Sequence, residues 1–104
     1  MSAVFSLQCS VQQRYYFGYG PEAEIEWFPI GEEFMGYHDS AEDCKEIIAL
    51  ANPFLSTNPS KVDEYLKKPT YQDYGVYGPW SAFSIPDNEV PNRFWLYTIT
   101  QIAE

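Results

Sequence analysis

The stretch FSLQCSVQQRYYFGYGPEAEIEWF, residues 5–28, decides the fold. Its first eight residues alternate between apolar and polar side chains, which is typical of a β-strand with one buried face. A second alternating run, residues 22–28, follows a cluster of turn-forming residues at 18–21. The sequence therefore predicts a β-hairpin whose first strand continues through Phe17.

The register of this hairpin follows from the two apolar faces. Every second residue of the second strand is acidic, namely Glu22, Glu24 and Glu26. A slip of one residue would turn these carboxylates toward the core. We therefore expect Tyr15 opposite Ile25 and Arg14 opposite Glu26.

Two helices are expected after the hairpin. Residues 39–53 begin with Ser40 as a helix N-cap and end at Asn52 before a proline, and their apolar residues recur at helical spacing. Residues 58–69 fit a shorter helix with a proline in its first turn. Residues 30–38, which contain two glycines, are predicted to be irregular.

The last third of the chain favours strands because it is rich in Tyr, Trp and Phe. We predict strands at 71–77, 80–85 and 93–102, and the last is apolar on both parities, which favours a central position in the sheet. The prediction is a single α+β domain, residues 1–104, in which an antiparallel sheet of about five strands packs against two helices in the order ββααβββ.

Composition fits a folded domain. Of the 104 residues, 45% are hydrophobic and 18% aromatic, which is too much apolar surface for a disordered acidic chain. The two cysteines, Cys9 and Cys44, lack metal-ligand spacing and fall on predicted core faces. No stretch reaches the length of a transmembrane helix, and the first residues lack the features of a signal peptide. We therefore expect a cytoplasmic protein with free thiols.

Charge is concentrated in one quarter of the chain. The net charge is −9, from 15 acidic and 6 basic residues. Residues 22–46 contain nine acids and a single base, so this segment alone carries −8. Such a chain is repelled by nucleic acid and by anionic membranes, so direct binding to either is not expected, and it attracts a cationic protein surface.

The acidic segment supplies the candidate partner-binding residues. We include one aromatic residue of this segment as an exposed anchor. The candidates are Glu22, Glu24, Glu26, Glu32, Glu33, Tyr37, Asp39, Glu42, Asp43 and Glu46. Two other roles are possible for some of the acids, since exposed charge protects edge strands from aggregation and acids stabilise the first turn of a helix.

Enzymatic and metal-binding readings have little support in the sequence. We find no P-loop, dinucleotide-binding or zinc-protease motif, and we predict neither catalytic residues nor a cofactor. A metal site could be assembled from His38, Asp39, Glu42 and Asp43, but the chain has no EF-hand loop and no second histidine. The aromatic residues Tyr74, Tyr77 and Trp80 fit either a core or an interface.

In charge and size the chain resembles the small acidic proteins that neutralise basic nucleases. This resemblance implies a non-enzymatic inhibitor of the toxin-immunity type, which would cover the active or nucleic-acid-binding surface of a basic partner. A first alternative is a phage-encoded inhibitor of a host defence complex, because carboxylates spaced along a strand resemble backbone phosphates. A second is a small carbohydrate-binding module or glycan-acting enzyme. The sequence leaves the oligomeric state open.

Overall fold

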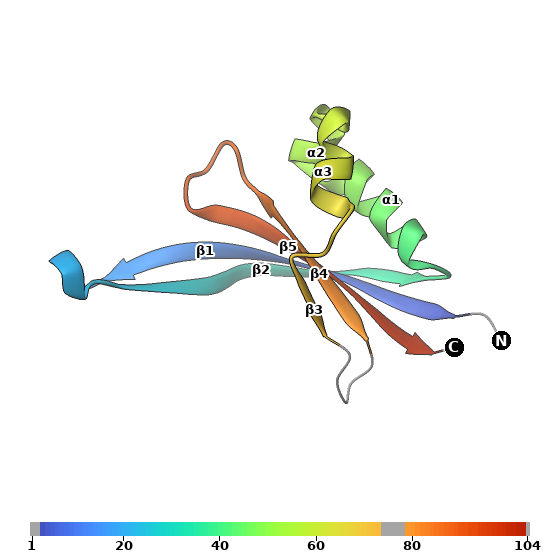
Figure 1. The fold of residues 1–104 in the computed structure, drawn as a ribbon, viewed down its shortest axis with the longest axis horizontal. Coiled ribbons are helices and arrows are strands. Elements are labelled where there is room, and N and C mark those ends of the chain that lie inside the picture. Colours follow the sequence, from blue (N-terminus) through green and yellow to red (C-terminus); the bar gives the residue numbers. More distant parts are fainter. Residues whose placement is uncertain (1–2, 74–78, 104) are drawn as a thin grey trace.

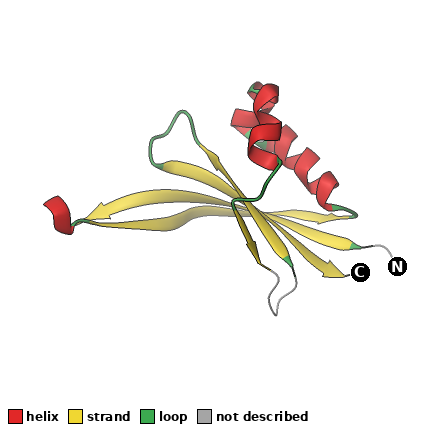
Figure 2. Cartoon of the chain, viewed as in Figure 1, coloured by secondary structure: helices red, strands yellow, loops and turns green. Residues whose placement is uncertain are grey.

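The computed structural model describes residues 3–73 and 79–103. The elements are β1 (Val4–Phe17), η1 (Gly20–Glu22), β2 (Glu24–His38), α1 (Ala41–Ala51), α2 (Pro53–Thr57), η2 (Pro59–Lys61), α3 (Val62–Leu66), β3 (Tyr71–Asp73), β4 (Trp80–Pro86) and β5 (Arg93–Ala103). The strands form one antiparallel sheet in the order β2-β1-β5-β4-β3, and the helices lie together on one side of it (Figures 1 and 2). The predicted α+β class is confirmed, and β5 is central as expected.

The end of the predicted strand 71–77 and its residues Tyr74 and Tyr77 lie outside the described residues. No helix in the two described ranges combines the length and the apolar character needed to cross a membrane.

The core forms between the sheet and the helices. On β1 and β5, Leu7 stands opposite Ile99 and Cys9 opposite Tyr97, and all four side chains are buried. Buried residues of the helices complete the cluster, namely Cys44, Ile48, Leu55 and Leu66. We call this side of the sheet the helix face and the opposite side the open face. Since side chains alternate along a strand, the remaining residues can be assigned to a face from the strand register.

The helical region contains one more α-helix than predicted. The Ser40 hydroxyl accepts a hydrogen bond from the backbone N–H of Asp43, as expected of an N-cap. Asn52 ends α1, and its side-chain oxygen then accepts bonds from the N–H groups of Phe54 and Leu55. Pro53 is therefore the first residue of α2 and not only a helix stop, because a proline fits the first turn of a helix.

Residues 30–38 are part of β2, so the prediction of an irregular segment is wrong. The pairing of β1 with β2 shifts between Val11 and Gln12 and again between Ser6 and Gln8. Each shift places an extra residue in β2, which breaks the alternation of apolar and polar side chains that marks a strand in a sequence. Gly36, with φ of +94°, lies in the second irregularity, where a residue with a side chain would be strained.

The C-terminal end of β1 and the N-terminal end of β2 extend together beyond the rest of the sheet. Gln13 is the last residue of β1 that pairs with β5, and beyond it β1 pairs with β2 alone. Figure 1 shows this part as a two-stranded projection that leads away from the helices. We call residues 14–27 the arm. It accounts for much of the elongated shape of the molecule, whose extents are 55 × 35 × 22 Å.

The register of the arm differs by one residue from the prediction. Arg14 stands opposite Trp27 instead of Glu26, and Tyr15 stands opposite Glu26 instead of Ile25. The prediction assumed that one face of the hairpin is buried, but the arm lies beyond the helices and both its faces are exposed. Glu22 was expected in the second strand and lies instead in the 3-10 turn η1, whereas β2 begins at Glu24.

Candidate protein-binding surface

Acidic and aromatic side chains alternate on one face of the arm. Glu24 stands opposite Phe17, and Glu26 opposite Tyr15, on the side continuous with the helix face. The ring of Phe28, at the base of the arm, packs edge-on against Tyr15 at 5.6 Å and against Phe17 at 6.2 Å between ring centroids. These five residues form what we call the acidic arm face. All five are exposed, so the rings and the carboxylates are available together.

Among the residues that the structure describes, the carboxylates of this face have no cationic partner. The salt bridges found among the described residues join Lys45 to Glu42 at 3.4 Å and Lys61 to Glu64 at 3.2 Å. A basic side chain near the base of the arm, Arg93, donates its Nε to the side-chain oxygen of Gln13 at 2.9 Å. Glu24 and Glu26 therefore remain free to attract a cationic group from another molecule.

The opposite face of the arm carries a cation. The Arg14 guanidinium lies 5.0 Å from the ring centroid of Tyr16 and 5.6 Å from that of Trp27. Trp27 also packs edge-on against Phe94 of β5, with centroids 4.7 Å apart. Ile25 completes this open arm face, and it is exposed, as are Tyr16 and Trp27. The two faces of the arm thus differ in the sign of their charge.

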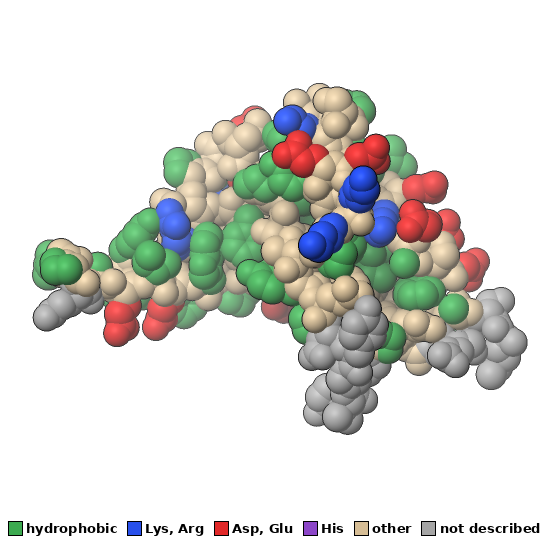
Figure 3. All heavy atoms as spheres, in the orientation of Figure 1, with side chains coloured by type: hydrophobic (Ala, Val, Ile, Leu, Met, Phe, Trp, Pro, Cys, Tyr) green, Lys and Arg blue, Asp and Glu red, His purple; other side chains and the backbone are tan. Residues whose placement is uncertain are grey.

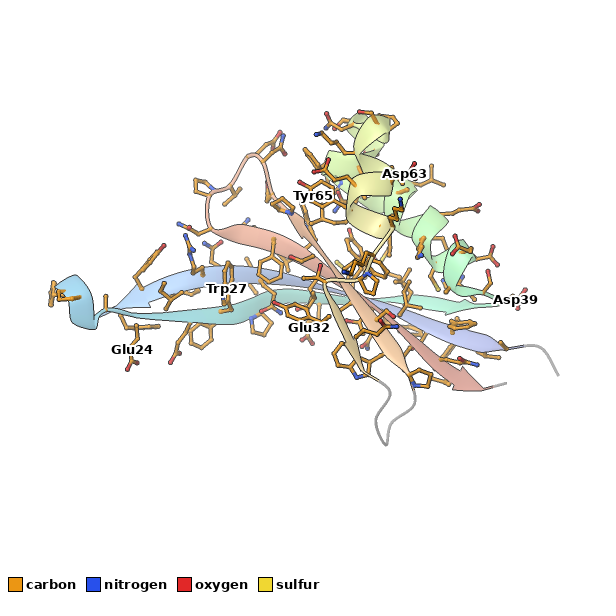
Figure 4. All side chains as sticks on the ribbon, in the orientation of Figure 1. Glu24, Trp27, Glu32, Asp39, Asp63 and Tyr65 are labelled. Carbon is orange, nitrogen blue, oxygen red and sulfur yellow. The ribbon has the colours of Figure 1, made fainter. Side chains whose placement is uncertain are left out.

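The structure does not bring the acidic candidates together. Figure 4 shows Glu24 on the arm, Glu32 in the middle of β2 and Asp39 at the other end of the molecule. Figure 3 likewise shows acidic side chains on the arm and, separately, around α1. Glu32 and Glu33 point to opposite faces of the sheet, because they pair with the neighbouring residues Ser10 and Cys9. The segment therefore presents several small acidic groups.

The acids of α1 have a local explanation. Glu42 and Asp43 lie in the first turn of α1, where negative charge interacts favourably with the helix dipole. Glu42 also pairs with Lys45, whereas Glu46 lies further along the same helix, and Asp39 precedes its cap. This arrangement favours a stabilising role for the α1 acids over a partner-binding role.

Tyr37 is exposed, but in a different setting from the one expected. It was assigned to a loop and lies in β2, opposite Ser6. Its side chain is 63% exposed, and its ring packs edge-on against Phe34 at 5.0 Å on the open face. Tyr37 is therefore an available aromatic residue, on the opposite side of the sheet from Glu24 and Glu26.

The sequence reasoning missed the aromatic part of the candidate surface. Tyr15, Phe17 and Phe28 were treated as continuations of a half-buried strand. The signal in the sequence was the run Tyr15–Phe17, in which three consecutive residues are aromatic, so that one face alone cannot hold them all. Consecutive aromatics on a hairpin with no covering element place rings on both faces.

The buried polar groups serve the core. Burial raises the pKa of the Cys9 thiol above its ordinary value, with smaller effects from Tyr97 and Glu33, and burial likewise raises the pKa of Cys44. Burial also raises the pKa of Tyr97, whose hydroxyl accepts a hydrogen bond from Asn52 Nδ2 at 3.0 Å. Neutral thiols in a core are poor nucleophiles, so neither cysteine has the setting of a catalytic residue.

The residues considered for a metal site are not assembled into one. Nε2 of His38 donates to the backbone carbonyl of Met35 at 2.9 Å. Within residues 3–73 and 79–103, no group of three or more His, Cys, Asp or Glu side chains is arranged to hold a metal ion.

Comparisons with known protein families, with curated proteins and with solved structures give no match to the chain.

Proposed function

We propose that this chain is a small non-enzymatic inhibitor that binds a basic, nucleic-acid-acting protein and blocks its working surface. The arm is the part that docks. The observation that carries this proposal is the acidic arm face, where the unpaired Glu24 and Glu26 stand opposite the exposed rings of Phe17 and Tyr15. Carboxylates at an interface steer a cationic partner toward it, and the rings supply the contact area that loses water on binding.

The spacing of the two carboxylates indicates how the inhibitor would block its partner. Glu24 and Glu26 are two residues apart on one face of a strand, which spaces them by about 6.6 Å. This interval is close to that between phosphates of an extended nucleic-acid strand, so the face can occupy Arg and Lys side chains that hold phosphates. The toxin-immunity type and the phage-encoded, nucleic-acid-mimicking type of inhibitor share this docking chemistry.

The glycan-binding alternative has weaker support. Sugars stack on the open faces of tryptophan rings, and Trp27 is the exposed tryptophan in the described part of the chain. Its ring already contacts the guanidinium of Arg14 and the ring of Phe94, so a sugar that stacked on it would have to share the ring with these two side chains. We also propose a cytoplasmic location, which is supported by the two buried free thiols.

Paired charge variants test the proposal. Wild type, Glu24→Gln/Glu26→Gln and the control Asp63→Asn/Glu64→Gln would each be used to capture proteins from cells of the source organism. The control lowers the negative charge by the same amount on α3. The proposal expects a basic, nucleic-acid-acting protein whose activity is inhibited by wild type and the control, and whose association rate falls about tenfold for the arm variant.

The salt dependence separates this proposal from others. If charge steers the arm, the association rate of the purified pair falls steeply as salt is raised from 20 to about 150 mM, and it falls less steeply for the arm variant. A captured protein that is acidic, an association rate that ignores salt, or equal losses in both double variants would each refute the arm as the docking element.

A further inference from the structure

A groove lies on the open face at the base of the arm. It has a volume of 630 Å³ and is formed by the arm, by β4 and β5 and by the loop between them, with Tyr71 of β3 at one side. Its lining includes Gln12, Arg14, Trp27, Ser84, Phe94 and Leu96. The groove therefore combines apolar side chains, three of them aromatic, with polar and charged groups, as is common for sites that recognise a short segment of another molecule.

Arg14 is held at this groove by the neighbouring loop. Its backbone N–H donates to the Asn92 carbonyl at 2.8 Å, and its Nη2 donates to the side-chain oxygen of Asn92. The rings of Tyr16 and Trp27 flank the guanidinium. An arginine fixed by its main chain, by an amide and by two rings has lost most of its freedom before any ligand arrives, which lowers the cost of binding.

The fold leaves this guanidinium without a full set of acceptors. Its Nε is buried and has no hydrogen-bond partner, and no carboxylate of the described residues forms a salt bridge with Arg14. Among the described residues, the acid that lines the groove is Asp87, and one of its side-chain oxygens accepts the N–H groups of Glu89 and Val90. Arginine pairs best with planar carboxylates, so the lack of a carboxylate partner among the described residues, and not the buried Nε, leaves the Arg14 guanidinium available to an anion from outside the chain.

The charge around the groove supports the binding of a single anionic group beside Arg14. The chain has six basic residues, and the guanidinium of one of them, Arg14, lines the groove, whereas Arg93 pairs with Gln13 and turns its side chain to the helix face. Arg14 is thus an isolated cation in a molecule of net charge −9. A polyanion would be repelled by the whole molecule, whereas a single carboxylate between apolar groups meets mainly the local charge.

We propose that the groove binds a peptide segment of a protein partner that presents one Glu or Asp side chain beside an apolar residue. The carboxylate lies against the Arg14 guanidinium, and the apolar neighbour packs on Trp27, Phe94 and Leu96. This site goes beyond the proposed function, because it takes an acidic ligand on the face of the arm opposite to Glu24 and Glu26.

The test uses defined peptides and the full chain. The probes are blocked eight-residue peptides with a central glutamate flanked by leucine or phenylalanine on a Gly-Ser background, matched peptides with glutamine, and an oligothymidine of eight nucleotides. Nuclear magnetic resonance of the wild type reports on the Arg14 Nε–H and the Trp27 indole N–H. We expect the glutamate peptides to shift both signals and to bind at least about tenfold more tightly than the glutamine peptides.

Variants complete the test. Arg14→Gln should weaken glutamate-peptide binding about tenfold or more, and Arg14→Lys should weaken it partly, because lysine keeps the charge but not the planar fork. The control Lys68→Gln and the variant Glu24→Gln/Glu26→Gln should bind the peptide as wild type does, which separates this site from the acidic arm face.

Three results would overturn the proposal. The first is equal binding of glutamate and glutamine peptides to the wild type, including no binding of either. The second is a response of the two signals to the oligothymidine alone. The third is self-association of the wild type that is abolished both by Arg14→Gln and by Glu24→Gln/Glu26→Gln, since the occupant would then be the arm of a second copy.

Discussion

Arg14 stands directly opposite Trp27 on the arm, with its guanidinium 5.6 Å from the centroid of the indole ring. This pair joins the hairpin to the rest of the sheet, because Trp27 also packs against Phe94 of β5 and Arg14 bonds to Asn92 in the β4–β5 loop. Contacts with β5 and with the β4–β5 loop thus hold the base of the arm in place.

Trp27→Ala should destabilise the fold. The change removes the edge-on contact with Phe94 and the cation–π contact with Arg14, so we expect the free energy of unfolding in urea to fall by about 1–3 kcal/mol. The control Tyr19→Ala changes a tip residue that is 95% exposed and should alter this free energy by less than about 0.5 kcal/mol. Equal effects of the two changes would show that Trp27 does not brace the arm.

The part of the fold that could be predicted is the part with one buried face. The alternation from Phe5 to Gln12 reflects a real core, and the caps and prolines marked the start of α1 and the helical region that follows it. In the arm the predicted register was wrong by one residue. Neither face of the arm is buried, so the glutamates are exposed to solvent in either register and cost no desolvation energy. Cross-strand contacts such as those of Arg14 and Trp27 are not visible as a period in the sequence.

For the candidate site, the sequence predicted an excess of negative charge in one segment but not how the acids are arranged in space. Composition located the acids between Glu22 and Glu46, but it could not show that four of them lie along β2 and the others beyond its two ends, so that they are spread along the molecule. Strand β2 continues through two irregularities, so acids that are close in sequence, such as Glu32 and Glu33, face opposite sides. The groove at Arg14 depends on pairing between residues about 80 positions apart, which a single sequence does not reveal.

Gly36→Ala should destabilise the fold more than Gly31→Ala. Gly36 has φ of +94°, and a Cβ there would also lie 3.4 Å from Nε2 of His38. We expect a loss of about 1–3 kcal/mol for Gly36→Ala, because an alanine is strained in this conformation. At Gly31 the nearest neighbour of a Cβ would be Val11 at 3.9 Å, an ordinary contact, so the change should cost less than about 1 kcal/mol. Thermal or urea unfolding of both variants checks the difference.

If Gly31→Ala cost as much as Gly36→Ala, the irregularity near Gly36 would not depend on a left-handed backbone. A glycine in a strand also costs backbone entropy, so Gly31→Ala could even be slightly stabilising. Whether Gly31→Ala stabilises or destabilises the fold does not change the loss expected for Gly36→Ala.

Asn52→Ala should be among the most damaging single changes. The Asn52 side chain is buried, accepts two N–H groups at the start of α2 and donates to the hydroxyl of Tyr97. Its loss leaves the N–H groups of Phe54 and Leu55 without this acceptor and removes one bond of the Tyr97 hydroxyl, and we expect the free energy of unfolding to fall by about 2–5 kcal/mol. Tyr97→Phe removes the bond with Asn52 and the interaction of the hydroxyl with Cys9 but leaves the helix cap in place, and it should cost about 1–2 kcal/mol.

A loss for Tyr97→Phe as large as that for Asn52→Ala would mean that the link to Tyr97, and not the helix cap, is the main contribution of Asn52. Circular dichroism during unfolding in urea measures both losses under the same conditions. The helical signal of the folded Asn52→Ala protein should also be lower than that of wild type, because α2 loses its cap.

Stability should decrease above about pH 9. Burial raises the pKa of Cys9 and of Cys44 above the ordinary thiol value of 9.0, so the unfolded chain releases these protons at a lower pH than the folded chain does. The unfolded state then binds fewer protons, and the free energy of unfolding falls as the pH rises through 9. Below that value the contribution is fully present. Tyr97 acts in the same direction above its ordinary value of 10.0.

The measurement is urea unfolding at pH 7, 8, 9 and 10. Cys9→Ala/Cys44→Ala loses packing at every pH, yet its free energy of unfolding should fall less between pH 8 and 10 than that of wild type, because two of the titrating groups are gone. The control Tyr19→Phe removes an exposed phenol and should keep the wild-type slope. A wild-type free energy that stays constant up to pH 10, or an unchanged slope in the double variant, would show that the thiols titrate alike in the folded and unfolded chain.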